Sequence, residues 1–174
     1  YRVNTLAGAK RKAEEFGHEG AFFAWESQET GDDACTLFNV TDIFTNRPQR
    51  TYFKDKQIHV SADIVFAMWD YCRTTGDYSL LVDGGLLLMY ECLWFFYTYS
   101  VFKPHKNRYE ILDVVGPDEY HERVNNNAFT NVMVKHAADI FILALEKVEK
   151  EFPEYFAKFN KDLAWAYDLS QKLY

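Results

Sequence analysis

The feature that most constrains the fold is a run of 17 mostly apolar and aromatic residues from Leu86 to Phe102. The run is slightly short for a membrane span, and it contains the polar residues Glu91, Thr98 and Ser100. A helix that is apolar on nearly all sides is typical of the buried inner layer of a large helical fold. We therefore expect a buried central helix here and no interaction with a membrane.

Helical periodicity dominates the rest of the chain, and strand alternation is scarce. Glycines at the expected helix ends, and Thr, Asp or Asn at the starts, give the boundaries. The expected helices span Thr5–Phe16, His59–Gly76, Asp77–Phe102, Ala128–Lys150 and Glu154–Leu173. Residues 26–57 and 103–127 are expected to be loops. The fold class is all-α, arranged as sequential hairpins in a toroid or bundle, with residues 1–174 forming part of one domain.

Charge and cysteine content limit the partners and the compartment. The 19 basic and 26 acidic residues give a formal charge of −7, which argues against nucleic acid or an anionic membrane as the main partner. Cys35, Cys72 and Cys92 match neither a disulfide framework nor a metal site, so we expect a reducing, cytoplasmic location and no bound metal. Because Tyr1-Arg2-Val3-Asn4 is not the start of a signal peptide, we also expect a piece of a longer protein.

The densest polar cluster is a ten-residue segment with four carboxylates and one histidine. These residues are Asp113, Asp118, Glu119, His121 and Glu122. Crowded, partly desolvated carboxyl groups have raised pKa values, which suits a general acid. The alternative is a solvated acidic loop whose Asp side chains cap local turns. The spacing fits neither a zinc-protease helix nor a calcium-binding loop.

Two further segments carry candidate ligand-binding residues. Trp25-Glu26 follows an aromatic stretch, and an indole beside a carboxylate is a typical way to hold a sugar ring; the alternative is a core Trp and a surface Glu. His59, Ser61 and Asp63 lie at the start of an otherwise apolar helix. One of these could cap the helix, and Asp63 could complement the helix dipole.

Together these segments resemble a known family, the inverting disaccharide phosphorylases of glycoside hydrolase family 65. Members of that family act on maltose, trehalose, kojibiose, nigerose and related α-glucosides. The matching segments are Tyr1-Arg2 with Thr5–Ala9, Gly20-Ala21 through Trp25–Ser27 with Thr30-Gly31, His59–Ile64, Thr75–Asp77, Val115–Glu122 and Asn126–Asn131.

The resemblance implies a fragment of an (α/α)6 barrel whose loops line the active site. It also implies that Glu119 is the general acid and that Trp25, Glu26 and Ser61 bind glucose. Secondary candidates are His59, Asp63, Asp118, His121 and Glu122. The stretch 32–57 is the least similar to the family, so the acceptor-sugar specificity is not inferred from it.

The implied reaction is phosphorolysis with inversion, giving β-glucose 1-phosphate and a free sugar. Inorganic phosphate is the co-substrate, and no other cofactor is expected. The full-length protein is expected to be a homo-oligomer, and the isolated fragment to be inactive, with apolar surface exposed where helices are missing. Two alternatives remain: an inverting hydrolase similar to acid trehalase, and a non-catalytic sugar-binding fragment.

Overall fold

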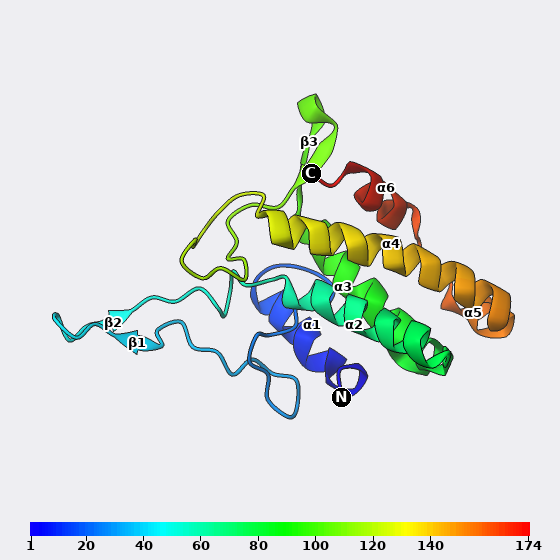
Figure 1. The fold of residues 1–174 in the computed structure, drawn as a ribbon, viewed down its shortest axis with the longest axis horizontal. Coiled ribbons are helices and arrows are strands. Elements are labelled where there is room, and N and C mark those ends of the chain that lie inside the picture. Colours follow the sequence, from blue (N-terminus) through cyan, green and yellow to red (C-terminus); the bar gives the residue numbers. More distant parts are fainter.

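The computed structural model describes residues 1–174 and is mainly helical, with two short antiparallel hairpins (Figure 1). The helices are α1 (Leu6–Glu15), α2 (Val60–Thr75), α3 (Leu86–Tyr99), α4 (Ala128–Glu151), α5 (Pro153–Phe159) and α6 (Ala164–Lys172). The hairpins pair β1 (Val40–Thr41) with β2 (Pro48–Gln49) and β3 (Val101–Lys103) with β4 (Arg108–Glu110). Single turns of 3-10 helix lie at Val3–Thr5 and Pro104–Lys106, and a π-helical turn lies at Leu81–Gly85.

The apolar run forms the centre of the fold, as its composition predicts. Helix α3 packs against α1, α2, α4 and α6, which removes its apolar side chains from water on nearly all sides. The fully buried residues of this helix are Leu86, Leu88, Met89, Cys92, Leu93, Phe95 and Phe96. The expectation of a buried inner helix is therefore confirmed.

Exposed apolar side chains lie elsewhere, on α2 and α4. Phe66 on α2 and Phe129, Val132 and Leu143 on α4 all face solvent. The apolar spacing in Ala128–Lys150 predicts that the last three face inward together with Ile140 and Leu145, and only Ile140 and Leu145 are buried. The rest of the buried face of α4 includes Val134, Ala137, Ala138, Phe141, Ala144 and Val148. Apolar surface is thus exposed on α2 and α4, whereas the apolar run is buried.

Several expected helix boundaries are confirmed by backbone geometry. Gly76 closes α2 in the left-handed conformation, with φ of 72°. Asn127 caps α4, because its side-chain oxygen accepts a hydrogen bond from the Thr130 N–H at 3.0 Å. Thr5 does not cap α1 in this way; its hydroxyl donates to the carbonyl oxygens of Tyr1 and Arg2 in the preceding turn.

Two expectations about secondary structure are wrong. The expected helix Glu154–Leu173 is divided into α5 and α6 by residues 160–163, where the Asp162 carboxylate accepts a hydrogen bond from the Ala164 N–H at 3.0 Å and forms a local turn. The expected helix Asp77–Phe102 ends earlier, at Tyr99, and the β3–β4 hairpin, Val101–Glu110 around Pro104–Lys106, continues into the segment that was expected to be irregular.

Helix α4 is long and apolar enough to cross a membrane by length and composition, and half of its apolar window is buried inside the fold. It packs against α2, α3, α5 and α6. A core helix of a globular domain meets the same criterion. The packing of α4 is that of such a core helix.

Candidate active site

A buried extended segment, Gly20–Ala24, leads to the predicted sugar-binding residues. The backbone of Gly20 lies so close to α3 that a Cβ atom there would be 2.3 Å from the Glu91 carbonyl oxygen. The Ala21 N–H donates to that same carbonyl at 2.8 Å, and the Phe22 N–H donates to the Ala9 carbonyl of α1 at 3.0 Å. The segment is therefore held between two helices by its own main chain.

Ser61 holds the same segment from α2. Its hydroxyl donates to the Ala21 carbonyl at 3.1 Å and accepts from the Phe23 N–H at 2.9 Å. The Ser61 residue is fully buried, and its single proton is used within the chain. In the structure Ser61 supports this segment, and its predicted contact with glucose stays a prediction.

Trp25 and Glu26 leave the core where this segment ends. Trp25 is 47% exposed. Its indole meets the His59 ring edge-on, with 6.0 Å between the ring centroids. The Glu26 side chain is exposed, and it makes no hydrogen bond or ion pair within the chain. An exposed indole beside an uncommitted carboxylate is the arrangement that the sequence predicts for holding a sugar.

His59 and Asp63 form a pair one turn apart at the start of α2. The His59 Nδ1 atom lies 2.7 Å from an Asp63 carboxylate oxygen, whereas the His59 Nε2 atom is buried without a hydrogen-bond partner. The His59 ring also packs edge-on against Phe129, at 5.2 Å between centroids. His59 therefore connects Trp25 to the first turn of α4, and it does not cap α2 through its side chain.

The acidic segment is a loop that is closed at its base by ion pairs. Asp113 lies 2.8 Å from the Arg123 Nε atom and 3.0 Å from the Lys56 Nζ atom. These two cations, Arg123 first, lower the pKa of Asp113 to about 2. Val114 and Val124 form an isolated antiparallel bridge beside these pairs. At neutral pH the Asp113 anion thus closes the loop at its base.

Within the loop, only some of the carboxyl groups are committed to a partner. Asp118 lies 2.6 Å from His121 Nδ1 and accepts from the Tyr120 N–H at 3.1 Å. These contacts, His121 first, lower the pKa of Asp118, so this group favours the anion. Glu119 and Glu122 are exposed and make no hydrogen bond or ion pair within the chain. Of the loop carboxylates, only these two have no partner within the chain.

The acid loop and the Trp25 segment each approach the start of α4, the loop through Gly116 and the segment through the His59 ring. The Val115 N–H donates to the Lys56 carbonyl at 3.0 Å, which attaches the loop to the chain just before α2. A Cβ atom on Gly116 would lie 2.5 Å from the Asn127 amide nitrogen, so the loop passes directly over the cap of α4. No hydrogen bond or ion pair joins Glu119 to Trp25 or Glu26, and their predicted proximity stays a prediction.

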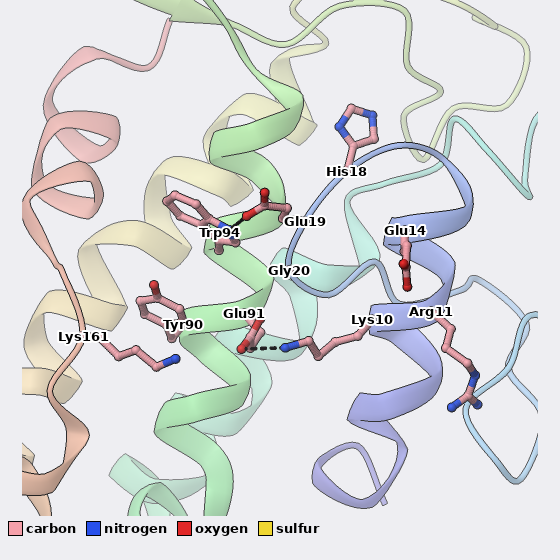
Figure 2. Close-up of a pocket in the computed structure, with 10 residues that line it drawn as sticks. All are labelled: Lys10, Arg11, Glu14, His18, Glu19, Gly20, Tyr90, Glu91, Trp94 and Lys161. Carbon is pink, nitrogen blue, oxygen red and sulfur yellow. Dashed lines mark hydrogen bonds and ion pairs between the residues drawn. The ribbon is translucent and has the colours of Figure 1, made fainter.

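An open cavity of about 480 Å³ lies elsewhere, between α1 and α3 (Figure 2). Lys10 and Glu91 form an ion pair of 2.9 Å across it, and Trp94 donates to Glu19 at 2.7 Å. None of the residues predicted for the active site lines this cavity. We therefore place the candidate site at the Trp25-Glu26 segment and the acid loop, near the start of α4, and not in this cavity.

The sequence did not reveal some of the residues that hold the site. Asp113 was included in the acidic cluster, but its partners Lys56 and Arg123 lie 57 and ten positions away and were not identified (113 − 56 and 123 − 113). Asn127 was expected as a cap but not as the neighbour of Gly116. No local pattern connects such residues, because their proximity depends on how the loop folds back over α4.

The comparison with known families decides the assignment. The profile of the glycosyl hydrolase family 65 central catalytic domain matches residues 1–174, the entire chain. The chain belongs to this family. The resemblance inferred from the sequence is confirmed.

Similar proteins of this family are sugar phosphorylases. A nigerose phosphorylase from Lachnoclostridium phytofermentans is 52% identical over 92% of this chain. A 1,2-alpha-glucosylglycerol phosphorylase from Bacillus selenitireducens is 44% identical over 84% of it. The solved structure of a putative kojibiose phosphorylase from human microbiome superposes with a TM-score of 0.80 at 26% identity, covering 99% of this chain and 24% of that one. The chain spans 21% of the nigerose phosphorylase and 20% of the glucosylglycerol phosphorylase.

Proposed function

We propose that the protein containing this family 65 chain is an inverting phosphorylase acting on an α-glucosidic disaccharide. The observation that carries the proposal is that two segments approach the start of α4: the acid loop with its uncommitted Glu119, at Asn127, and the segment that presents Trp25, through His59 and Phe129. The paired carboxylates Asp113 and Asp118 leave this glutamate available for proton transfer.

In the proposed reaction Glu119 is the general acid. Its carboxyl proton passes to the glycosidic oxygen as the bond from that oxygen to the anomeric carbon of glucose breaks. A phosphate oxygen attacks the same carbon from the opposite face, which inverts the configuration. The products are β-glucose 1-phosphate and a free sugar, and Glu119 is left as the anion. Since phosphate is already anionic, the reaction needs no catalytic base from the protein.

The glucose unit is proposed to lie against Trp25. The apolar CH face of the sugar packs on the exposed indole, and its hydroxyl groups donate to the Glu26 carboxylate. Both groups are presented by the segment that Ser61 holds in the core. His59 and Asp63 support the indole from the side and are secondary binding candidates.

The proposal extends to the whole protein. We place this chain in an (α/α)6 barrel, in a cytoplasmic homo-oligomer that uses inorganic phosphate and no other cofactor. The free, buried thiols of Cys35, Cys72 and Cys92 support a reducing compartment. The exposed apolar residues Ile43 and Phe44 at the tip of the β1–β2 hairpin support an oligomer.

The test is a phosphate-dependence assay of the full-length enzyme. Because this chain is 52% identical to a nigerose phosphorylase, nigerose is the first substrate to assay. Kojibiose, trehalose, maltose and glucosylglycerol follow. We expect cleavage only with phosphate, and a β-configured glucose 1-phosphate by proton NMR. Phosphate-independent cleavage would instead identify the hydrolase, and sugar binding without cleavage would identify a binding module.

A further inference from the structure

A buried ion pair joins α1 to the turn that follows Trp25-Glu26. The Lys12 ammonium lies 3.1 Å from an Asp33 carboxylate oxygen, and their side chains are only 2% and 4% exposed. Lys12 also lies over the Phe22 ring, at 3.7 Å from its centroid. A second cation, Lys54, approaches the same Asp33 oxygen at 3.7 Å. The pair therefore contacts the buried segment on one side and the long loop on the other.

A buried pair of this kind is poorly explained by stability alone. Removing two charges from water carries a large desolvation penalty, which their mutual attraction often does not offset. Burial lowers the pKa of Lys12, and Asp33 acts against that shift. The neighbouring pair Arg11–Asp32 joins the same two segments while 57% and 43% exposed. The two segments can therefore be paired without burying any charge, which suggests that Lys12–Asp33 has a different role.

The Asp33 residue fixes the backbone around the sugar-binding residues. Its other carboxylate oxygen accepts a hydrogen bond from the Cys35 N–H at 2.8 Å. Asp33 and Ser27 form an isolated antiparallel bridge, and the Ala34 N–H donates to the Glu26 carbonyl at 2.9 Å. A displacement of Asp33 is thus transmitted through two backbone contacts to Glu26 and Ser27.

The helix and the turn also touch through their backbones at one point. A Cβ atom on Gly8 would lie 2.3 Å from the Gly31 carbonyl carbon, so the turn rests directly on α1. Gly8 and Lys12 are four residues apart and share one face of the helix. The close approach sets the distance between the elements, and the ion pair sets the register of the turn along the helix.

We propose that Lys12 and Asp33 are positioning residues that hold the Trp25-Glu26 segment in the orientation that binds the glucose unit of the substrate. This inference rests on the proposed function, because that function assigns glucose to Trp25 and Glu26. The pair itself does not touch the sugar. It acts through the bridge at Ser27 and the hydrogen bond to the Glu26 carbonyl.

The test uses the double variant Lys12→Met/Asp33→Asn in the full-length enzyme. It leaves no unpaired charge at either position, and the amide introduced at position 33 keeps an oxygen acceptor for the Cys35 N–H. We expect kcat/KM for the disaccharide to fall about 10- to 100-fold through a higher KM, with a much smaller change in kcat. The matched control Arg11→Met/Asp32→Asn removes the exposed pair and should stay within about twofold of the wild-type values.

Backbone hydrogen exchange provides a readout that does not depend on activity. The amides of Gln28, Ala34 and Cys35 should exchange faster in the Lys12/Asp33 variant and not in the control. Unchanged exchange would overturn the proposal. Faster exchange with an unchanged KM would also overturn it, because the pair would then hold the turn without affecting binding. If the wild-type enzyme shows no phosphate-dependent cleavage, the proposed function fails. In that case, hydrogen exchange and glucose binding, compared between wild type and the Lys12/Asp33 variant, still test the positioning role of the pair.

A second variant covers the case in which the double variant does not fold. Ala34→Pro removes the N–H that donates to Glu26, at an exposed position outside the core. It leaves Lys12 and Asp33 intact. We expect the same rise in KM from this variant. A folded Ala34→Pro enzyme with wild-type KM would show that the bridge does not position the sugar-binding residues, and the proposal would be wrong.

Discussion

The two halves of the candidate site are held in different ways. The Trp25-Glu26 half follows a segment whose main chain is bonded to α1, α2 and α3, and whose Phe22 ring stacks on Phe95 at 4.8 Å. The acid loop is held at its base by Asp113 and over the α4 cap, while Pro117–Glu122 is exposed throughout. One half is thus part of the core, and the other is a surface loop that is closed at its base.

This difference predicts different effects of substitutions in the two halves. A substitution in the Gly20–Ala24 segment should reduce stability and, through it, sugar binding, because the contacts that pack this segment in the core also position Trp25 and Glu26. In the loop a change at Glu119 leaves all the recorded hydrogen bonds and ion pairs in place. Stability measurements and kinetic measurements should therefore separate the two halves cleanly.

The largest effect is expected for Glu119→Gln in the full-length enzyme. The amide keeps the shape and removes the transferable proton, so kcat should fall by a factor of about 100 to 10,000. The thermal transition should not move, since no contact is lost. The measurement is steady-state kinetics with phosphate, together with a substrate whose leaving group needs no proton and should recover much of the rate.

Glu122→Gln is the matched control for this variant, because Glu122 is equally exposed and unpaired. It should keep near wild-type turnover. The opposite result, an inactive Glu122→Gln enzyme with an active Glu119→Gln enzyme, would move the general acid three residues along the loop.

The next effect is expected in the core half, for Phe22→Ala. Truncation of a buried phenylalanine typically costs about 3–5 kcal/mol, through lost burial and the cavity that remains. Phe22 also supports the Lys12 ammonium, which adds to the disturbance. Chemical denaturation of the full-length enzyme, followed by circular dichroism, measures the shift of the helical transition.

Glu149→Ala serves as the control for the Phe22 variant, because Glu149 is exposed on α4 and makes no hydrogen bond or ion pair within the chain. Its effect on the free energy of unfolding should be within about 0.5 kcal/mol of zero. Equal destabilisation by both variants would contradict the assignment of Phe22 to the core of the site.

A smaller loss is expected for Ser61→Ala. The change leaves the buried Phe23 N–H without its acceptor, which costs about 1–3 kcal/mol. If Ser61 only supports the segment, any rise in KM should follow the loss of stability and should diminish at lower temperature. A variant with wild-type stability and a strongly raised KM would show that Ser61 contacts the sugar after all.

The smallest effect is the pH dependence contributed by Asp113. Its pKa is lowered in the folded state, so its ion pairs stabilise the fold above the unfolded-state pKa of about 4. That contribution is lost as the pH falls toward about 2. Exposed ion pairs contribute about 0–1 kcal/mol, so the stability difference between wild type and Asp113→Asn should be small above pH 4 and should vanish toward pH 2. A difference that grows on acidification would contradict this assignment.

The sequence predicted the parts of this molecule that depend on local pattern. The buried helix from Leu86, the Gly76 cap and the Asn127 cap follow from periodicity and capping chemistry, and the structure has them. The motifs also predict a site at Trp25 and Glu119, and both residues are exposed, but their roles stay predictions. Local pattern explains these successes.

The remaining features depend on contacts between distant segments. The Ser61 hydroxyl could bind a sugar, but in the structure it is hydrogen-bonded to the backbone of Phe23 and Ala21, which lie 38 and 40 positions away in sequence. The Lys12–Asp33 pair was not identified, because a lysine on a helix and an aspartate in a polar loop each look solvent-exposed. The break before α6 was missed because the apolar spacing continues through it, while the backbone turns at Asp162.

The separate anchoring of the Gly20–Ala24 segment bears on how such enzymes diversify. The β1–β2 hairpin projects away from the helices (Figure 1), so insertions, deletions and substitutions in it leave the main-chain bonds of that segment untouched. Similar proteins carry names as different as nigerose, kojibiose and trehalose 6-phosphate phosphorylase. The hairpin can therefore change in length and sequence without altering the contacts that hold the segment before Trp25.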